Sequence, residues 1–310
     1  MLSIDRIQVL APHAGDNVPK QHVVSRVVLK RFAATLPHRR AGSLEVVDLG
    51  HPEAKPTYRG PRGCGYIDHF VRYASKSLEQ LWGSVENGLG KAITACEDGS
   101  IFAHPEHVKT LKDVIVLHLV RSVHTRAFLD KIWHENLTNL RTAMLDRRDL
   151  LTKVFLSRYG LYPGGPECLG LVLDDALRSS FALKDADAFF RESLERLFNL
   201  GSRHLEVRGL EVSRLPIGEF VIGDAPAVAV GAGGRIGLLQ GVGIDSATTI
   251  ALPLGPALIV STGDADAFHI LSQERVDALN RWQVQAASRY VYCRPGSGLV
   301  EAIRAAARSS

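Results

Sequence analysis

Residues 248–261 read Thr-Thr-Ile-Ala-Leu-Pro-Leu-Gly-Pro-Ala-Leu-Ile-Val-Ser, two short apolar runs separated by proline and glycine. Runs of this length and composition, bounded by turn residues, are typical of buried strands. Runs of the same kind recur nearby, at residues 205–212, 219–222, 227–230 and 290–293. The last third of the chain is therefore predicted to form a mainly antiparallel sheet, interrupted by one helix over residues 272–287.

The first two-thirds of the chain show helical periodicity instead. Helices are expected at residues 20–35, 66–94, 106–128, 133–159 and 185–200. Between the first two lie an expected strand at 43–49 and a proline- and glycine-rich loop at 50–65, of the kind that borders a site. Because helices and strands are segregated along the chain, the predicted fold class is α+β, with a helical N-terminal part packed on a C-terminal sheet.

Length and composition limit the class of protein. At 310 residues and 45% hydrophobic content, the chain can bury the core of a single compact domain over residues 1–310, or of a helical part at 1–200 and a sheet-rich part at 201–310. A net charge of +4, spread along the chain, allows a nucleic acid as partner. No apolar stretch approaches a membrane span, and Met1–Arg6 lacks the features of a secretory signal, so we expect a cytoplasmic protein without a membrane partner.

The cysteines indicate reduced thiols. The chain has four, without a CxxC pair or a zinc-type spacing to histidine. Two other classes of site lack their sequence motif. The glycines at 231–234 and 237–243 match neither the dinucleotide-binding fingerprint nor a Walker loop. The GxSxG motif of serine hydrolases is also absent. These glycines are predicted to form turns.

His22, Arg26 and Arg31 lie in the first predicted helix. An imidazole coordinates metals or transfers protons near neutral pH, so His22 is a candidate catalytic residue, or a histidine near a helix start without further role. Arg26 and Arg31 could bind a phosphate through their guanidinium groups, or could form a solvated basic face.

Glu79 and Glu86 lie seven residues apart, on one side of the next predicted helix. Carboxylates are the ligands that Mg²⁺ and Mn²⁺ prefer, so both are candidate metal ligands, with Glu86 also a candidate catalytic residue. Arg121 and His118 lie in the apolar helix expected at 106–128. A buried guanidinium must meet an anion, either a substrate phosphate or a structural partner such as Glu86.

Asp224 follows a buried apolar run and precedes Ala225-Pro226. A carboxylate fixed in this way at a strand end is a candidate catalytic residue and metal ligand, although such an aspartate also caps backbone groups in turns. Asn280 is expected to tie down a loop from inside a helix.

Several of these segments resemble a bacterial family, the domain of unknown function four-two-three-eight, along nearly the whole chain. The matching residues are His22, Val24, Leu29, Phe32, Glu79, Glu86, Asp224, Pro226, Asp277 and Asn280. The chain departs from the family pattern at Gln21, Ser25 and Val28, where the family has histidine, proline and tyrosine. The resemblance implies site positions but no reaction, and any mechanism that needs two adjacent histidines cannot operate here unchanged.

Together these residues lead to the hypothesis of a metal-dependent phosphodiesterase or nuclease, which would suit a toxin or phage-defence effector. Asp224 and Glu86 would bind Mg²⁺ or Mn²⁺, His22 would activate water, and the arginines would neutralise the phosphate. Two alternatives remain open: a non-catalytic binding or regulatory module braced by these polar residues, and a small-molecule transferase with residues 53–65 as a lid.

Overall fold

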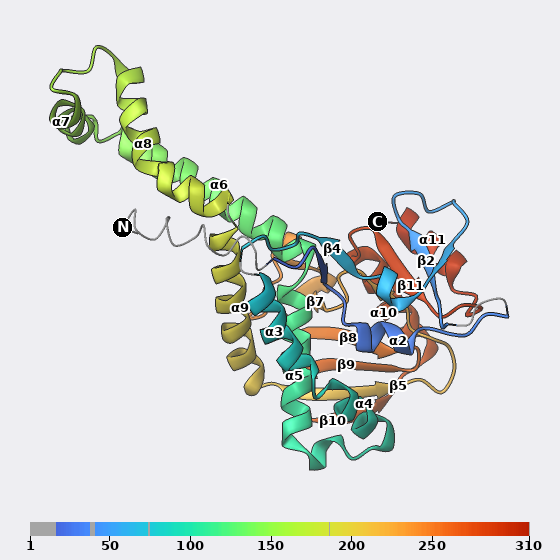
Figure 1. Ribbon diagram of the computed structural model, residues 1–310. Coiled ribbons are helices and arrows are strands. Elements are labelled where there is room, and N and C mark those ends of the chain that lie inside the picture. The colour runs from blue at the N-terminus through green and yellow to red at the C-terminus, as the bar shows by residue number, and fades with distance from the viewer. Residues whose placement is uncertain (1–16, 38–40, 74, 186, 310) are drawn as a thin grey trace.

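The computed structural model describes residues 17–37, 41–73, 75–185 and 187–309 (Figure 1). The expectation for Met1–Arg6 lies outside these residues. The fold is α+β, as the sequence predicts, with helices arranged around a five-stranded sheet from the C-terminal third and a four-stranded sheet built from both ends of the chain.

The largest sheet has five strands, in the order β10-β5-β9-β8-β7. All of its pairings are antiparallel except that of β10 with β5, which is parallel. The strands are β5 (Gly209–Arg214), β7 (Val228–Val230), β8 (Thr249–Gly255), β9 (Leu258–Gly263) and β10 (Ala267–Ile270). The two runs of residues 248–261 are thus neighbouring strands, joined by a tight turn at Pro256-Ala257.

A second sheet joins the two ends of the chain, so the expected segregation of helices and strands is incomplete. It has four strands in the order β3-β2-β11-β6, and all pairings are antiparallel. Its strands are β2 (Leu44–Asp48), β3 (Thr57–Arg59), β6 (Ile222–Gly223) and β11 (Tyr290–Cys293). A short pair of β1 (Lys20–His22) and β4 (Tyr66–Asp68) lies apart from both sheets.

Helices cover these sheets. The helices of the body are α2 (Arg26–Arg31), α3 (Ser75–Glu86), α4 (Leu89–Asp98), α5 (Pro105–Val120), α9 (Ala188–Glu206), α10 (Gln273–Ala286) and α11 (Val300–Arg308). Helix α5 lies between α9 and α3 beside the five-stranded sheet, while α10 and α11 pack together near the C-terminus (Figure 1). Nine residues of α5 are buried, which makes it the central helix that its apolar sequence predicts.

Three helices form an arm that projects from this body: α6 (Val123–Leu145), α7 (Arg148–Tyr159) and α8 (Pro166–Asp185), with α7 at the tip (Figure 1). Among the described residues, no helix combines the length and the apolar content needed to cross a bilayer.

Two predicted helices differ from the structure in ways that shape the site. Residues 20–35 form strand β1, a bend and only a short helix α2, because Gln21 and His22 pair with β4 through their backbones. The helix expected over 106–128 breaks at Arg121, since the Ser122 hydroxyl accepts the Thr125 N–H and begins α6 as an N-cap.

The loop expected at 50–65 is held down rather than free to act as a lid. It contains β3, and the Arg304 side chain donates to the carbonyls of Pro52 and Ala54. At its end, the Gly65 N–H donates to the Tyr292 hydroxyl, and its φ of +62° with Val24 2.7 Å from where a Cβ would lie leaves no room for a side chain. The transferase alternative stays a prediction, and in this structure its expected lid is packed against α11 and β11.

Candidate functional site

Arg121 occupies the C-cap position of α5 and is 2% exposed. Its guanidinium donates to a Glu86 carboxylate oxygen 2.6 Å away and lies over the Trp82 ring, with Cζ 5.1 Å from the ring centroid. Both partners come from α3, on the same side of that helix. The ion pair that the sequence favours for a buried arginine is thus present, and it joins the end of α5 to the end of α3.

His118 lies one turn before Arg121 and is fully buried. Its Nε2 accepts the backbone N–H of Ser25 at 3.0 Å, so the proton is on Nδ1, which faces the Val114 carbonyl at 2.8 Å. Burial and the charge of Arg121 lower the pKa of His118 to about 4, and the ring is neutral at pH 7. His118 is therefore a structural residue that fixes the start of α2.

His22 lies at the end of β1, beside this start. The neighbouring Gln21 is fully buried and exchanges two hydrogen bonds with the backbone of Val71, so it anchors β1 and offers no group for chemistry. His22 is half-buried, and its Nε2 has no hydrogen-bond partner. Burial, followed by the charges of Arg26 and Arg121, lowers the pKa of His22, which keeps the imidazole neutral and able to accept a proton.

The two glutamates of α3 differ in their environment. Burial raises the pKa of Glu79, and the charge of Glu86 raises it further, while Arg121 opposes them. The Oε1 atom of Glu79 is buried without a partner. Burial alone would also raise the pKa of Glu86, but the charge of Arg121, which also donates a hydrogen bond to this carboxylate, holds it below its ordinary value. Two carboxyls on one helix face are thus tuned in opposite directions.

We call His22, Arg26, Glu79, Glu86 and Arg121 the Arg121 cluster. The structure brings together these predicted site residues from β1, α2, α3 and the end of α5. Four of them carry a buried polar atom without a partner: His22 Nε2, Arg26 Nε, Glu79 Oε1 and Arg121 Nε. Buried polar atoms are normally paired, so such a concentration is typical of a place where water or a ligand binds.

Asp224 lies outside the Arg121 cluster. Its carboxylate accepts the backbone N–H groups of Ser288, Arg289 and Tyr290 at 2.7–3.0 Å, and so ties the end of β6 to the turn before β11. Burial raises the pKa of Asp224 although these N–H donors oppose it. No hydrogen bond or ion pair among the described residues joins Asp224 to the cluster. Its carboxylate caps backbone N–H groups in this structure, and a metal ligand shared with Glu86 stays a prediction.

Two other predicted residues also serve the framework. Arg31 lies at the far end of α2 and forms an ion pair with Glu97, away from Arg26. Asn280 accepts the Val221 N–H and donates to the Glu219 carbonyl, which is the loop-fixing role that the sequence indicates.

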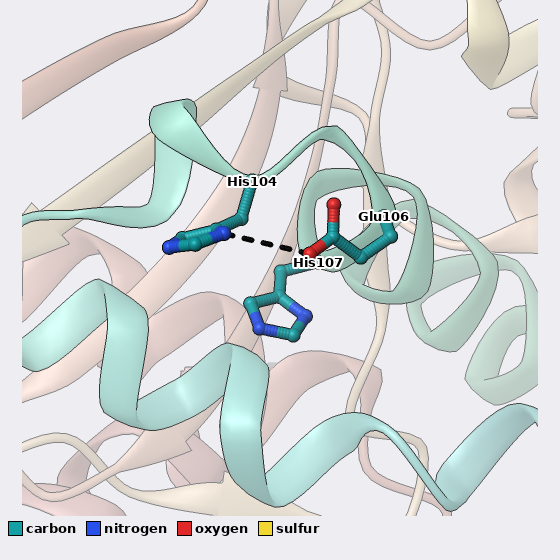
Figure 2. Close-up of side chains that lie close together, drawn as sticks. All are labelled: His104, Glu106 and His107. Atoms are coloured by element: carbon teal, nitrogen blue, oxygen red, sulfur yellow. Dashed lines mark ion pairs between the residues drawn. The ribbon is translucent and has the colours of Figure 1, made fainter.

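The described residues contain one group of His, Cys, Asp or Glu side chains with at least three ligand atoms within 4.8 Å of one another: His104, Glu106 and His107 (Figure 2). His22, Glu79 and Glu86 do not meet this distance as a group. Neither hydrophobic periodicity nor the motifs considered above single out this group, although His-Pro-Glu-His at residues 104–107 places three potential ligands within four positions. The four cysteines are free thiols, and burial raises the pKa of Cys64 to about 11 and of Cys96 to about 12.

Comparison with known proteins identifies one family. The family model described as "Protein of unknown function (DUF4238)" matches residues 20–297. No curated protein and no solved structure matches the chain. The match spans β1 through β11 and includes every residue of the Arg121 cluster.

Proposed function

Since the chain belongs to the DUF4238 family, whose function is unknown, we propose an activity from the Arg121 cluster: hydrolysis of a phosphodiester bond in a nucleic acid. The observation that carries this proposal is the pair of opposite pKa shifts at His22 and Glu79, both beside Arg121. A histidine kept neutral can act as a base, and a carboxyl whose pKa is raised can act as an acid.

In this proposal each group of the cluster has one role. The unpartnered Nε2 of His22 takes a proton from the attacking water, whose oxygen forms the new bond to phosphorus. Glu79 in its protonated form gives its proton to the leaving oxygen as the old phosphorus–oxygen bond breaks. Arg26 and the free Nε–H of Arg121 stabilise the charge that develops on the phosphate oxygens. Glu86 holds the Arg121 guanidinium in place through their ion pair.

The cluster is largely shielded from solvent. His22, Arg26 and Glu79 are half-buried and expose part of each side chain, whereas their unpartnered atoms His22 Nε2, Arg26 Nε and Glu79 Oε1 are buried and Arg121 is 2% exposed. A phosphate would therefore reach these atoms only after side chains of the cluster move, and the charged groups, shielded by protein, would then stabilise it more strongly than in bulk solution.

This acid–base mechanism uses no metal ion, whereas the mechanism expected from the sequence depends on one. A Mg²⁺ or Mn²⁺ ion at the cluster would have Glu79 and Glu86 as its carboxylate ligands, because Asp224 is engaged elsewhere, and Glu79 could then not act as an acid. The acid–base mechanism therefore predicts cleavage in EDTA, whereas the metal-dependent mechanism predicts that EDTA abolishes it.

The test is a cleavage assay with end-labelled single-stranded RNA, single-stranded DNA and duplex DNA, with Mg²⁺, with Mn²⁺ and with EDTA. Loss of a general acid or base costs about 10²–10⁴-fold, so His22→Asn and Glu79→Gln should each lower the rate by that factor. His51→Asn is the matched control, because His51 is exposed and follows β2, which carries no residue of the cluster. Absence of cleavage with every substrate and metal, from correctly folded protein, would contradict the proposal.

A second candidate is a non-catalytic binding module, and the Arg121–Glu86 ion pair is the observation that favours it. In that case Arg26→Gln would weaken nucleic-acid binding in a filter-binding assay, and no condition would give cleavage. A toxin or phage-defence role stays a prediction for either candidate.

A further inference from the structure

We propose that His104, Glu106 and His107 form a binding site for a divalent transition metal of the zinc type, separate from the Arg121 cluster. The three side chains gather at the first turn of α5 (Figure 2). The cluster lies at the other end of the same helix. With a rise of about 1.5 Å per residue, His107 and Arg121 are roughly 20 Å apart along the helix axis.

The spacing of the first two ligand atoms fits a bound ion. His104 Nδ1 lies 3.4 Å from Glu106 Oε1. A tetrahedral zinc ion with bonds of about 2.0–2.1 Å holds neighbouring ligand atoms roughly 3.3 Å apart. With the imidazole proton on Nδ1 this contact is a hydrogen bond; with the proton on Nε2, His104 Nδ1 and Glu106 Oε1 both offer electron pairs, which a metal ion between them can accept.

His107 supplies the third ligand after a small adjustment. Its ring centroid is 5.2 Å from that of His104, and its ligand atom is within 4.8 Å of the other two. The His104 and Glu106 side chains are 46% and 66% exposed, so their rotation displaces no packed neighbour. A movement of about 1.5 Å closes the set to the spacing of a zinc site.

The backbone beneath the site is already ordered. Pro105 fixes the first position of α5, and the His104 carbonyl accepts the N–H groups of His107 and Val108 at 2.9 and 3.2 Å. The His104 side chain makes no capping hydrogen bond, so it is free to bind a metal without loss of a cap. A site presented on a fixed backbone loses less conformational entropy on binding than one on a loose loop.

The ligand set selects the class of metal. Two imidazoles and one carboxylate suit Zn²⁺ and its neighbours Co²⁺, Ni²⁺ and Cu²⁺, whereas Mg²⁺ and Ca²⁺ prefer sites made only of oxygen. The positive end of the α5 dipole weakens cation binding by less than about tenfold, and the nearby carboxylate of Glu106 opposes that effect. Three protein ligands leave a fourth position for water or another ligand.

The test is calorimetric titration of the untagged full chain with ZnCl₂ and, separately, with MgCl₂. We expect one zinc ion per chain and no comparable binding of Mg²⁺. Loss of a side chain that only hydrogen-bonds to a metal ligand lowers metal affinity by about 10–100-fold. His107→Asn and Glu106→Gln each remove a ligand itself, so each should weaken zinc binding by more than that. Glu106 is exposed and the half-buried His107 lies outside the apolar core, so both variants should retain the wild-type circular dichroism spectrum.

Two control variants locate the ion. His51→Asn removes an exposed imidazole elsewhere, and Glu79→Gln removes a carboxyl of the Arg121 cluster; both should bind zinc as the wild type does. Unchanged zinc affinity in His107→Asn, loss of binding in Glu79→Gln, or equal affinity for Mg²⁺ would overturn the proposal. Because the readout is binding and not cleavage, a failed nuclease assay would leave this result unaffected.

Discussion

Asp224 and Glu79 are both carboxyls whose pKa burial raises, yet their surroundings differ in one decisive respect. Asp224 accepts three backbone N–H groups, which link two distant segments of chain. Glu79 has a buried oxygen without any partner. The first arrangement uses a charge to fix the backbone, while the second keeps a polar atom available beside an arginine. Pairing, more than burial, separates a structural carboxylate from a candidate catalytic one.

Arg121→Met should give the largest loss of stability, because it leaves the Glu86 carboxylate without its ion-pair partner. Removal of one member of a buried pair costs about 3–5 kcal/mol in the free energy of unfolding. Urea denaturation followed by circular dichroism measures it. The double variant Arg121→Met/Glu86→Met should recover part of the loss, and a purely additive double variant would show that the two side chains are not coupled.

Asp224→Ala tests the fully paired carboxylate. The substitution leaves the N–H groups of Ser288, Arg289 and Tyr290 without their acceptor, and we expect a loss of about 3 kcal/mol in the free energy of unfolding. Asp264→Ala, at an exposed aspartate, is the matched control and should change stability by less than about 0.5 kcal/mol. Zinc binding at α5 should stay as in the wild type. If Asp224→Ala is as stable as wild type, Asp224 is not a structural carboxylate and its contrast with Glu79 fails.

His118 makes stability depend on pH. Its folded pKa of about 4 lies below the value of about 6.5 for an unfolded histidine, because it is buried beside Arg121. Between these pH values the unfolded chain binds a proton that the folded chain does not. The free energy of unfolding should therefore fall as pH falls, by at most about 1.4 kcal/mol per pH unit from this group.

The measurement for His118 is a series of urea denaturations between pH 7 and pH 5, with wild type and His118→Gln. The variant should be less stable at pH 7, because it lacks the ring that accepts the Ser25 N–H, but its stability should depend less steeply on pH. Equal slopes for the two proteins would show that His118 does not cause the effect.

Glu79→Gln should have the smallest effect on stability and so sharpens the comparison most. It removes a carboxyl whose buried oxygen has no partner, so the free energy of unfolding at pH 7 should stay within about 1 kcal/mol of wild type, or rise. The same variant should lose about 10²–10⁴-fold in cleavage rate. A large loss of stability in Glu79→Gln would identify Glu79 as a structural carboxylate like Asp224.

The sequence predicts individual helices and strands better than it predicts where a helix breaks or which strands pair. Strands β8, β9 and β11 and helix α10 are recognised because glycine, proline and polar residues mark their ends. The break at Arg121 is missed, although Ser122 is a typical N-cap residue, because an apolar period continues through it. Strand β10 is missed as well, because only tertiary pairing with β5 explains it.

The candidate site shows the same limit. Residue type alone points to His22, Arg26, Glu79, Glu86 and Arg121, and the structure brings these five together. Residue type equally points to Asp224 and Arg31, but Asp224 caps backbone N–H groups beside β11 and Arg31 forms an ion pair with Glu97 of α4. Which carboxylate meets which arginine depends on contacts between residues far apart in the chain, and periodicity carries no information about those.

The pairing of β2 with β11 has a consequence for synthesis of the protein. These strands come from nearly opposite ends of the chain, and β11 lies between β2 and β6. At about 5–20 residues per second, β2 waits on the order of ten seconds or more at the ribosome before its partner exists. Throughout that time one edge of a strand rich in valine and leucine is unpaired and open to association with other chains. The nascent protein should therefore depend on chaperones more than its finished fold suggests.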